Sequence, residues 1–96
     1  MNDREIYRKK FEAQLDEWKA DLNKLKARAD QESAERQGQL NERIKDLESR
    51  MDDGKKRLNE MKEDSGDAWN SIKDSADSAW DSLKSGFDDA WNKVKS

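Results

Sequence analysis

Adjacent carboxylates are the residues of this sequence whose types and spacing could do chemistry. Asp52 with Asp53, and Asp88 with Asp89, could in principle act as a general acid and a general base. The run from Asp52 to Gly54 also has residue types found in calcium loops, but it lacks the alternating acids of such a loop. Because 45% of all residues are charged, we interpret these carboxylates as solvated side chains on charged helices.

Residue types that other kinds of catalysis require are absent from the sequence. The chain has no histidine and no cysteine, which removes the usual zinc sites, thiol nucleophiles and Ser-His-Asp triads. It also has no glycine-rich phosphate loop of a standard form. We therefore expect no catalytic, cofactor-binding or metal-binding residue, and a protein that is not an enzyme and has no small-molecule substrate.

The balance of charge argues against nucleic acid as a partner. The chain has 20 basic and 23 acidic residues, a net charge of −3 and a pI of about 5.1. Proteins that bind nucleic acid usually carry a basic face and a pI well above neutrality. The basic runs 8–10 and 55–57 are each balanced by nearby acids, so we expect no nucleic-acid interface.

The composition is typical of long helices and coiled coils. Charged residues of both signs are interleaved, proline is absent and only four glycines occur in 96 residues. The first 20 residues have no apolar segment of the kind found in signal peptides, and no run of 18 apolar residues occurs. We expect a cytoplasmic, all-α protein, with a peripheral position at a membrane as the alternative.

Residues 1–63 carry an apolar stripe at helical spacing. Its large members are separated by steps of three and four residues, the period of a coiled-coil seam. They are Tyr7, Phe11, Leu15, Trp18, Leu22 and Leu25, and then Leu40, Ile44, Leu47, Met51, Leu58 and Met61, with Gly54 on the same stripe. Acid-first pairs at i,i+4, such as Asp46 with Arg50 and Asp53 with Arg57, further favour helix.

Two architectures fit the gap between Leu25 and Leu40, which has no large apolar residue. The spacing of three and four residues continues through this gap at Ala29, Ser33, Arg36 and Leu40. This continuity favours one helix over about 4–63, roughly 90 Å long, in a self-associating coiled coil. The alternative is a reversal within 31–38, near Gly38, and another at Asp64–Gly66. That chain would close as a monomeric antiparallel three-helix bundle.

Residues 64–96 repeat a phrase every 11 residues, with Trp69, Trp80 and Trp91 at equivalent positions. Eleven residues make three helical turns, so the apolar positions form one nearly straight arc. This hendecad repeat predicts an amphipathic helix with an interaction face formed by Trp69, Ile72, Ala76, Trp80, Leu83, Phe87, Trp91 and Val94.

The sequence leaves open which surface covers this interaction face. One interpretation is packing against helices of the same or a neighbouring chain. The other is a helix lying in a bilayer surface. Residues 66–96 hold six Asp against four Lys, a net charge of −2, whereas anionic lipid usually attracts an excess of Lys or Arg.

Two segments of the chain resemble a known family. The tail KEDSGDAWNSIKDSADSAWDSLKSGFDDAWNKVKS and the front YRKKFEAQLDEWKADLNKLKARAD are similar to small bacterial coiled-coil stress-response proteins, best represented in cyanobacteria and proteobacteria. The resemblance implies a cytoplasmic coiled-coil protein linked to environmental stress, with no catalytic residue to carry over. The sequence departs from the family pattern at Gly38. By period alone, the tail is also similar to desiccation proteins and exchangeable apolipoproteins.

We therefore predict a non-enzymatic structural protein that self-assembles through its apolar stripes. The expected partner is a second copy of the chain, in a homo-oligomer or, if the contact does not close, a filament. The alternatives are a peripheral protein that binds lipid through the tryptophan helix and a conditionally disordered protectant.

Overall fold

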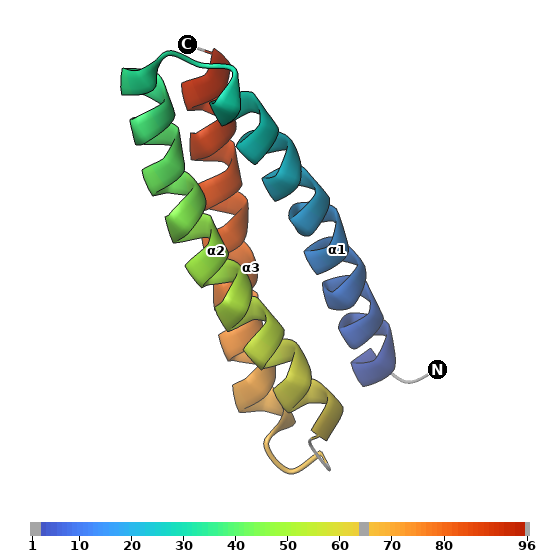
Figure 1. Cartoon of the computed structure of the whole chain (residues 1–96). Coiled ribbons are helices and arrows are strands. Elements are labelled where there is room, and N and C mark those ends of the chain that lie inside the picture. The colour runs from blue at the N-terminus through green and yellow to red at the C-terminus, as the bar shows by residue number, and fades with distance from the viewer. Residues whose placement is uncertain (1–2, 64–65, 96) are drawn as a thin grey trace.

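The computed structural model describes residues 3–63 and 66–95, which form an up-down-up helical bundle (Figure 1). Its helices are α1 (Asp3–Asp30), α2 (Ala34–Glu63) and α3 (Trp69–Lys95). The bundle measures 50 × 20 × 19 Å. The expected all-α class is confirmed for these residues, and α1 and α3 run parallel to each other on the same α2.

For the single chain, the expected continuous helix over about 4–63 is wrong, because α1 ends at Asp30 and α2 begins at Ala34. Gln31 N donates to Arg28 O and Glu32 N donates to Ala29 O, both at 3.1 Å, and these bonds close the end of α1. Gln37 N donates to Ser33 O at 2.8 Å, which is the first bond of α2 and places Ser33 at its N-cap. Folding back is favourable because α1 and α2 bury their apolar stripes against each other, which neither helix could do alone.

The reversal lies inside the predicted 31–38 region but not at Gly38. Gly38 is exposed within α2, and a Cβ added there would meet no atom within 4 Å. The predicted turn near Gly66 is confirmed at that residue, whose φ of +113° lies in the region that favours glycine. Asp64 and Ser65, which the same prediction included, lie outside the described residues.

The predicted apolar stripe supplies the core residues of α1 and α2. All its large members are buried except Tyr7, which is half-buried and packs against the core. Ala29 and Gly54 are buried on the same stripe. A 3/4 spacing therefore gave the inward face of both helices correctly, even though the expected chain path between them was wrong.

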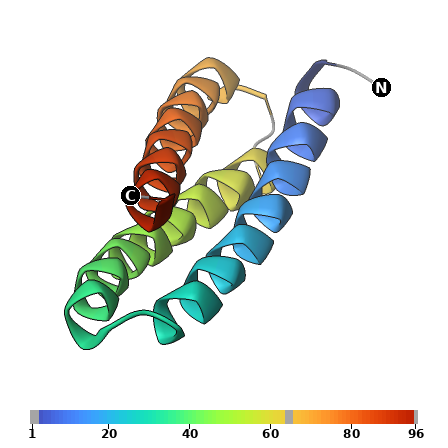
Figure 2. The same cartoon turned by 90° about the horizontal axis from the view of Figure 1, so that it is seen from above.

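Helix α3 lies closer to α2 than to α1 in both views (Figures 1 and 2). A Cβ built on Gly86 of α3 would lie 2.8 Å from Leu47 Cδ2 of α2. A Cβ built on Gly54 of α2 would lie 3.3 Å from Leu83 Cδ1 of α3 and 3.0 Å from Leu15 Cδ2 of α1. Glycine at these two positions therefore permits the close approach of the helices.

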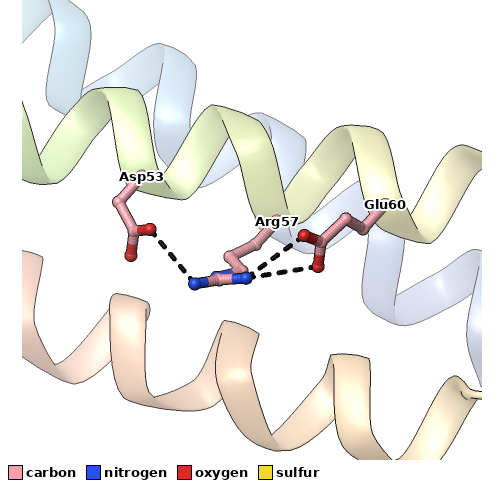
Figure 3. Close-up of polar contacts among 3 residues, drawn as sticks. All are labelled: Asp53, Arg57 and Glu60. Carbon is pink, nitrogen blue, oxygen red and sulfur yellow. Dashed lines mark hydrogen bonds and ion pairs between the residues drawn. The ribbon is translucent and has the colours of Figure 1, made fainter.

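Helical ion pairs occur at the predicted spacing on α2. Asp46 pairs with Arg50 at 3.0 Å, and Asp53 pairs with Arg57 at 3.3 Å. Figure 3 shows the Arg57 guanidinium between Asp53 and Glu60, which it meets at 3.2 Å. Such partly exposed pairs each stabilise a helix by about 0.2–0.5 kcal/mol, so they support α2 without deciding the fold.

Candidate functional site: the aromatic seam

Aromatic rings fill the space between α1 and α3. We call this set the aromatic seam; it consists of Tyr7, Phe11 and Trp18 of α1 and Trp69, Trp80 and Phe87 of α3. The rings form an unbroken series of contacts along the bundle. Because α1 and α3 are parallel, residues near the start of one helix meet residues near the start of the other.

The ring geometries are those that aromatic pairs favour. Trp69 meets Tyr7 edge-on with the ring centroids 5.6 Å apart, and Trp80 meets Trp18 at 5.3 Å with an interplanar angle of 68°. Trp18 also stacks on Phe87 at 6.0 Å with an interplanar angle of 7°. Pairs at 4.5–7 Å contribute about 0.5–1.5 kcal/mol beyond the burial of their area. The seam is therefore a major stabilising contact between α1 and α3.

Large and small residues divide the apolar arc of α3. At about 100° per residue, Trp69, Trp80 and Trp91 lie along one edge of the arc, whereas Ala79 and Gly86 lie along the other. The tryptophan edge faces α1 at Trp69 and Trp80, and the small-residue edge faces α2 at Gly86. This division explains why the backbone of α3 approaches α2 closely and stands farther from α1.

The predicted interaction face of α3 is directed toward the core of its own chain. Ala76, Leu83 and Phe87 are buried. The other members pack against the same core but remain partly exposed; they are Trp69, Ile72, Trp80, Trp91 and Val94. Ala79 and Ala90 are also buried, and their recurrence every 11 residues beside Trp80 and Trp91 was the sequence signal for their inward position.

A polar cluster covers one end of the seam. The Tyr7 hydroxyl donates a hydrogen bond to Asp77 Oδ1, and Lys73 Nζ donates to Asp77 Oδ2 at 3.2 Å. Lys73 also lies 5.3 Å from the centroid of the Tyr7 ring, and Arg4 lies 5.5 Å from that of Trp69. Asp77 could not be singled out from the sequence because it is one of many acids, and no local pattern places it opposite Tyr7.

The cluster changes the pKa of both partners of its hydrogen bond. Burial, together with donation to Asp77 and the negative charges of Asp77 and Asp81, raises the pKa of the Tyr7 phenol. The hydrogen bond from Tyr7 and the neighbouring Lys73 lower the pKa of Asp77. At neutral pH the phenol therefore stays protonated and donates, while the carboxylate stays ionised and accepts. The Tyr7–Asp77 hydrogen bond therefore links α1 to α3.

Titration of the phenol should reveal this hydrogen bond. Tyr7 is the only tyrosine of the sequence, so tyrosinate absorbance reports one residue. We expect its midpoint above the ordinary value of about 10. Because the folded pKa is raised, the stability that Tyr7 contributes is present below about pH 10 and is lost as pH rises further. Because the folded pKa of Asp77 is lowered, the stability that Asp77 contributes is present above about pH 4 and is lost in acid.

Tyr7→Phe is the matched variant for this titration, since it keeps the ring and removes the hydroxyl. The difference in unfolding free energy between the two proteins should be largest near neutrality and shrink at both extremes of pH. An ordinary phenol midpoint near 10, or a difference that does not change with pH, would show that the Tyr7–Asp77 bond is not formed in solution.

Other kinds of site are not found in the described part of the chain. Within residues 3–63 and 66–95, no group of three or more acidic residues is placed to hold a metal ion. None of the helices there has an apolar stretch long enough to span a bilayer. Comparisons with protein-family models, with curated proteins and with solved structures gave no match to this chain.

Proposed function

We propose that the chain is a non-enzymatic structural protein that acts by associating with further copies of itself. One observation carries this proposal. α1 and α2 meet in antiparallel fashion through stripes of 3/4 spacing, and ion pairs connect the two helices beside the stripes. Lys26 pairs with Glu48 at 3.3 Å, and Lys62 pairs with Glu12 at 3.8 Å. Apolar stripes flanked by such pairs are how coiled-coil helices select their partners.

The interface is self-complementary, which favours a second copy as the partner. One chain carries both the α1 surface and the α2 surface that fits it. Both surfaces are buried in the closed chain, so a second copy can take the place of either helix only when the bundle opens. A contact of this kind closes as a dimer when it is reciprocal and grows as a filament when it is not. The resemblance to bacterial stress-response proteins supplies the setting that we propose, a structural role under environmental stress.

Lipid binding through the tryptophan helix has less support. The partly exposed Trp69, Trp80 and Trp91 could meet a membrane surface, but Leu83 and Phe87 are buried. Lipid could reach these two only after the bundle opens. The net charge of −2 over residues 66–96 also gives no attraction to anionic lipid.

Sedimentation equilibrium from micromolar to millimolar concentration tests the proposal. We expect the mass to rise from the 11.2 kDa of one chain toward twice that value, with neutral vesicles causing no blue shift of the tryptophan emission. A mass of one chain at every concentration would contradict self-association. A monomer that binds vesicles with a blue shift would support the membrane alternative in its place.

A further inference from the structure

The backbone of the connection between α1 and α2 can adopt a helical conformation. The connection consists of Gln31, Glu32 and Ser33, none of which is glycine or proline. Among the described residues, Gly66, in the connection between α2 and α3, has a positive φ, and no residue of the 31–33 turn has one. The turn at 31–33 can therefore become helical without any residue leaving the left-handed region, whereas the turn at Gly66 cannot.

Side chains already bridge the 31–33 turn at helical spacing. Glu32 meets Arg28 of α1 at 3.5 Å and Arg36 of α2 at 3.7 Å, each four residues away. In a straight helix, residues four apart lie on one face a single turn from each other. Both ion pairs would therefore remain if α1 and α2 joined into one helix.

The apolar stripes also stay in phase when the turn straightens. Ala29 and Leu40 are the buried residues nearest the turn on either side, and they are 11 residues apart. Eleven residues make three turns with a drift of about 20°. A helix over 3–63 would therefore present the stripes of α1 and α2 along one side, over about 90 Å.

Straightening would remove α1 from its own bundle but leave α2 with α3. The α2–α3 contact has its own anchors, since Arg50 Nη1 donates to Ser82 O at 2.7 Å and Arg36 Nη2 donates to Lys93 O at 2.8 Å. The place vacated by α1 retains the α3 side of the aromatic seam, which is Trp69, Trp80 and Phe87, and the charges of Glu48 and Lys62. The segment that fits this place is α1 of another copy.

We propose that two copies exchange α1 by straightening the 31–33 turn, which gives a reciprocal dimer built on two helices of residues 3–63. This inference rests on the proposed self-association and supplies its structural route. Each exchanged α1 makes the contacts of the closed bundle with the partner chain, including Lys26–Glu48 and Glu12–Lys62. The balance between monomer and dimer is then decided by the turn and by protein concentration.

Two substitutions in the turn should shift this balance in opposite directions. Ser33 stands at the N-cap position of α2, where serine is favoured over alanine only in the closed chain. Ser33→Ala loses that preference, and alanine favours the straight helix. It should raise the association constant by about tenfold or more. Ala34→Pro is the matched control, because proline fits the first position of α2 but breaks a continuous helix. It should lower the association constant by about a hundredfold or more.

A distance within one chain identifies the exchange. The sequence has no cysteine, so spin labels can be attached at Ala13→Cys of α1 and Asn59→Cys of α2, both exposed positions. Labelled chains are diluted into excess unlabelled chains, so that only distances within a chain are measured. The labels lie on neighbouring helices, about 10 Å apart between axes, in the closed bundle. They lie about 70 Å apart along a straight helix.

The experiment is performed on the full chain refolded at millimolar concentration, with dimer and monomer separated. We expect a dimer with the long distance, more of it for Ser33→Ala and almost none for Ala34→Pro. A dimer that keeps the short distance would overturn the exchange of α1 and leave self-association standing. A chain that stays monomeric even as Ser33→Ala would overturn both.

Discussion

Replacing Trp18 by alanine is expected to lower the free energy of unfolding by about 3–5 kcal/mol. Trp18 is 6% exposed and contacts both Trp80 and Phe87 of α3. Its removal eliminates two ring contacts and leaves a cavity in the middle of the aromatic seam. Because small domains are stable by only about 5–15 kcal/mol, this variant should be close to unfolding at ambient temperature. Urea denaturation followed by circular dichroism measures the loss.

Trp91→Ala is the matched control for Trp18→Ala. Trp91 has the same side chain but is only partly buried near the end of α3, so we expect less than half of the loss. Trp18→Phe should fall between wild type and Trp18→Ala, since it retains a ring. If Trp18→Ala lowered the free energy of unfolding no more than Trp91→Ala, the result would contradict the packing of Trp18 against Trp80 and Phe87.

Replacing Gly54 by leucine should also destabilise the bundle, by about 1–3 kcal/mol or more. The first added carbon would already lie 3.0 Å from Leu15 Cδ2 and 3.3 Å from Leu83 Cδ1, and the remaining carbons of leucine have no space between the helices. Helix propensity acts in the opposite direction, because leucine is better than glycine in a helix by nearly 1 kcal/mol. A net loss of stability would therefore result from overpacking between the helices. Thermal unfolding measures this loss.

Gly38→Leu isolates the helix propensity in the same α2. Gly38 is exposed, with no atom within 4 Å of an added Cβ, so this variant should be stabilised by about 0.5–1 kcal/mol. Opposite signs at positions 54 and 38 are the expected result. Equal stabilisation at both positions would contradict the close approach of the helices at Gly54.

The inward faces of α1 and α2 were predictable from sequence because they depend on local periodicity. Leu25, Leu40 and their neighbours on the stripe repeat at three and four residues, and a helix with such a stripe must bury it somewhere. The turn at 31–33 was not predictable in the same way. The phase from Ala29 to Leu40 is the same in a bent and in a straight chain, so local pattern could not decide between them.

The partners of the tryptophan helix depend on contacts between residues far apart in sequence. The 11-residue repeat gave the arc of α3 and the positions of Trp69 and Trp80 on it. It could not indicate that Tyr7 and Trp18 lie opposite them, since each pair is separated by about 60 residues. Gly38 was considered a turn residue because it is a glycine in a stretch without large apolar residues. Gly86 was not recognised as a contact because its role depends on Leu47 of α2.

The most direct test of the aromatic seam is the nuclear Overhauser effect between the rings of Trp18 and Trp80, recorded at a concentration where the chain sediments as a monomer. Ring protons of this pair should show cross-peaks, since their centroids are 5.3 Å apart. The tryptophan face of α3 then packs within its own chain. Absence of these cross-peaks in a folded monomer, or their appearance only between differently labelled chains, would contradict the intrachain seam.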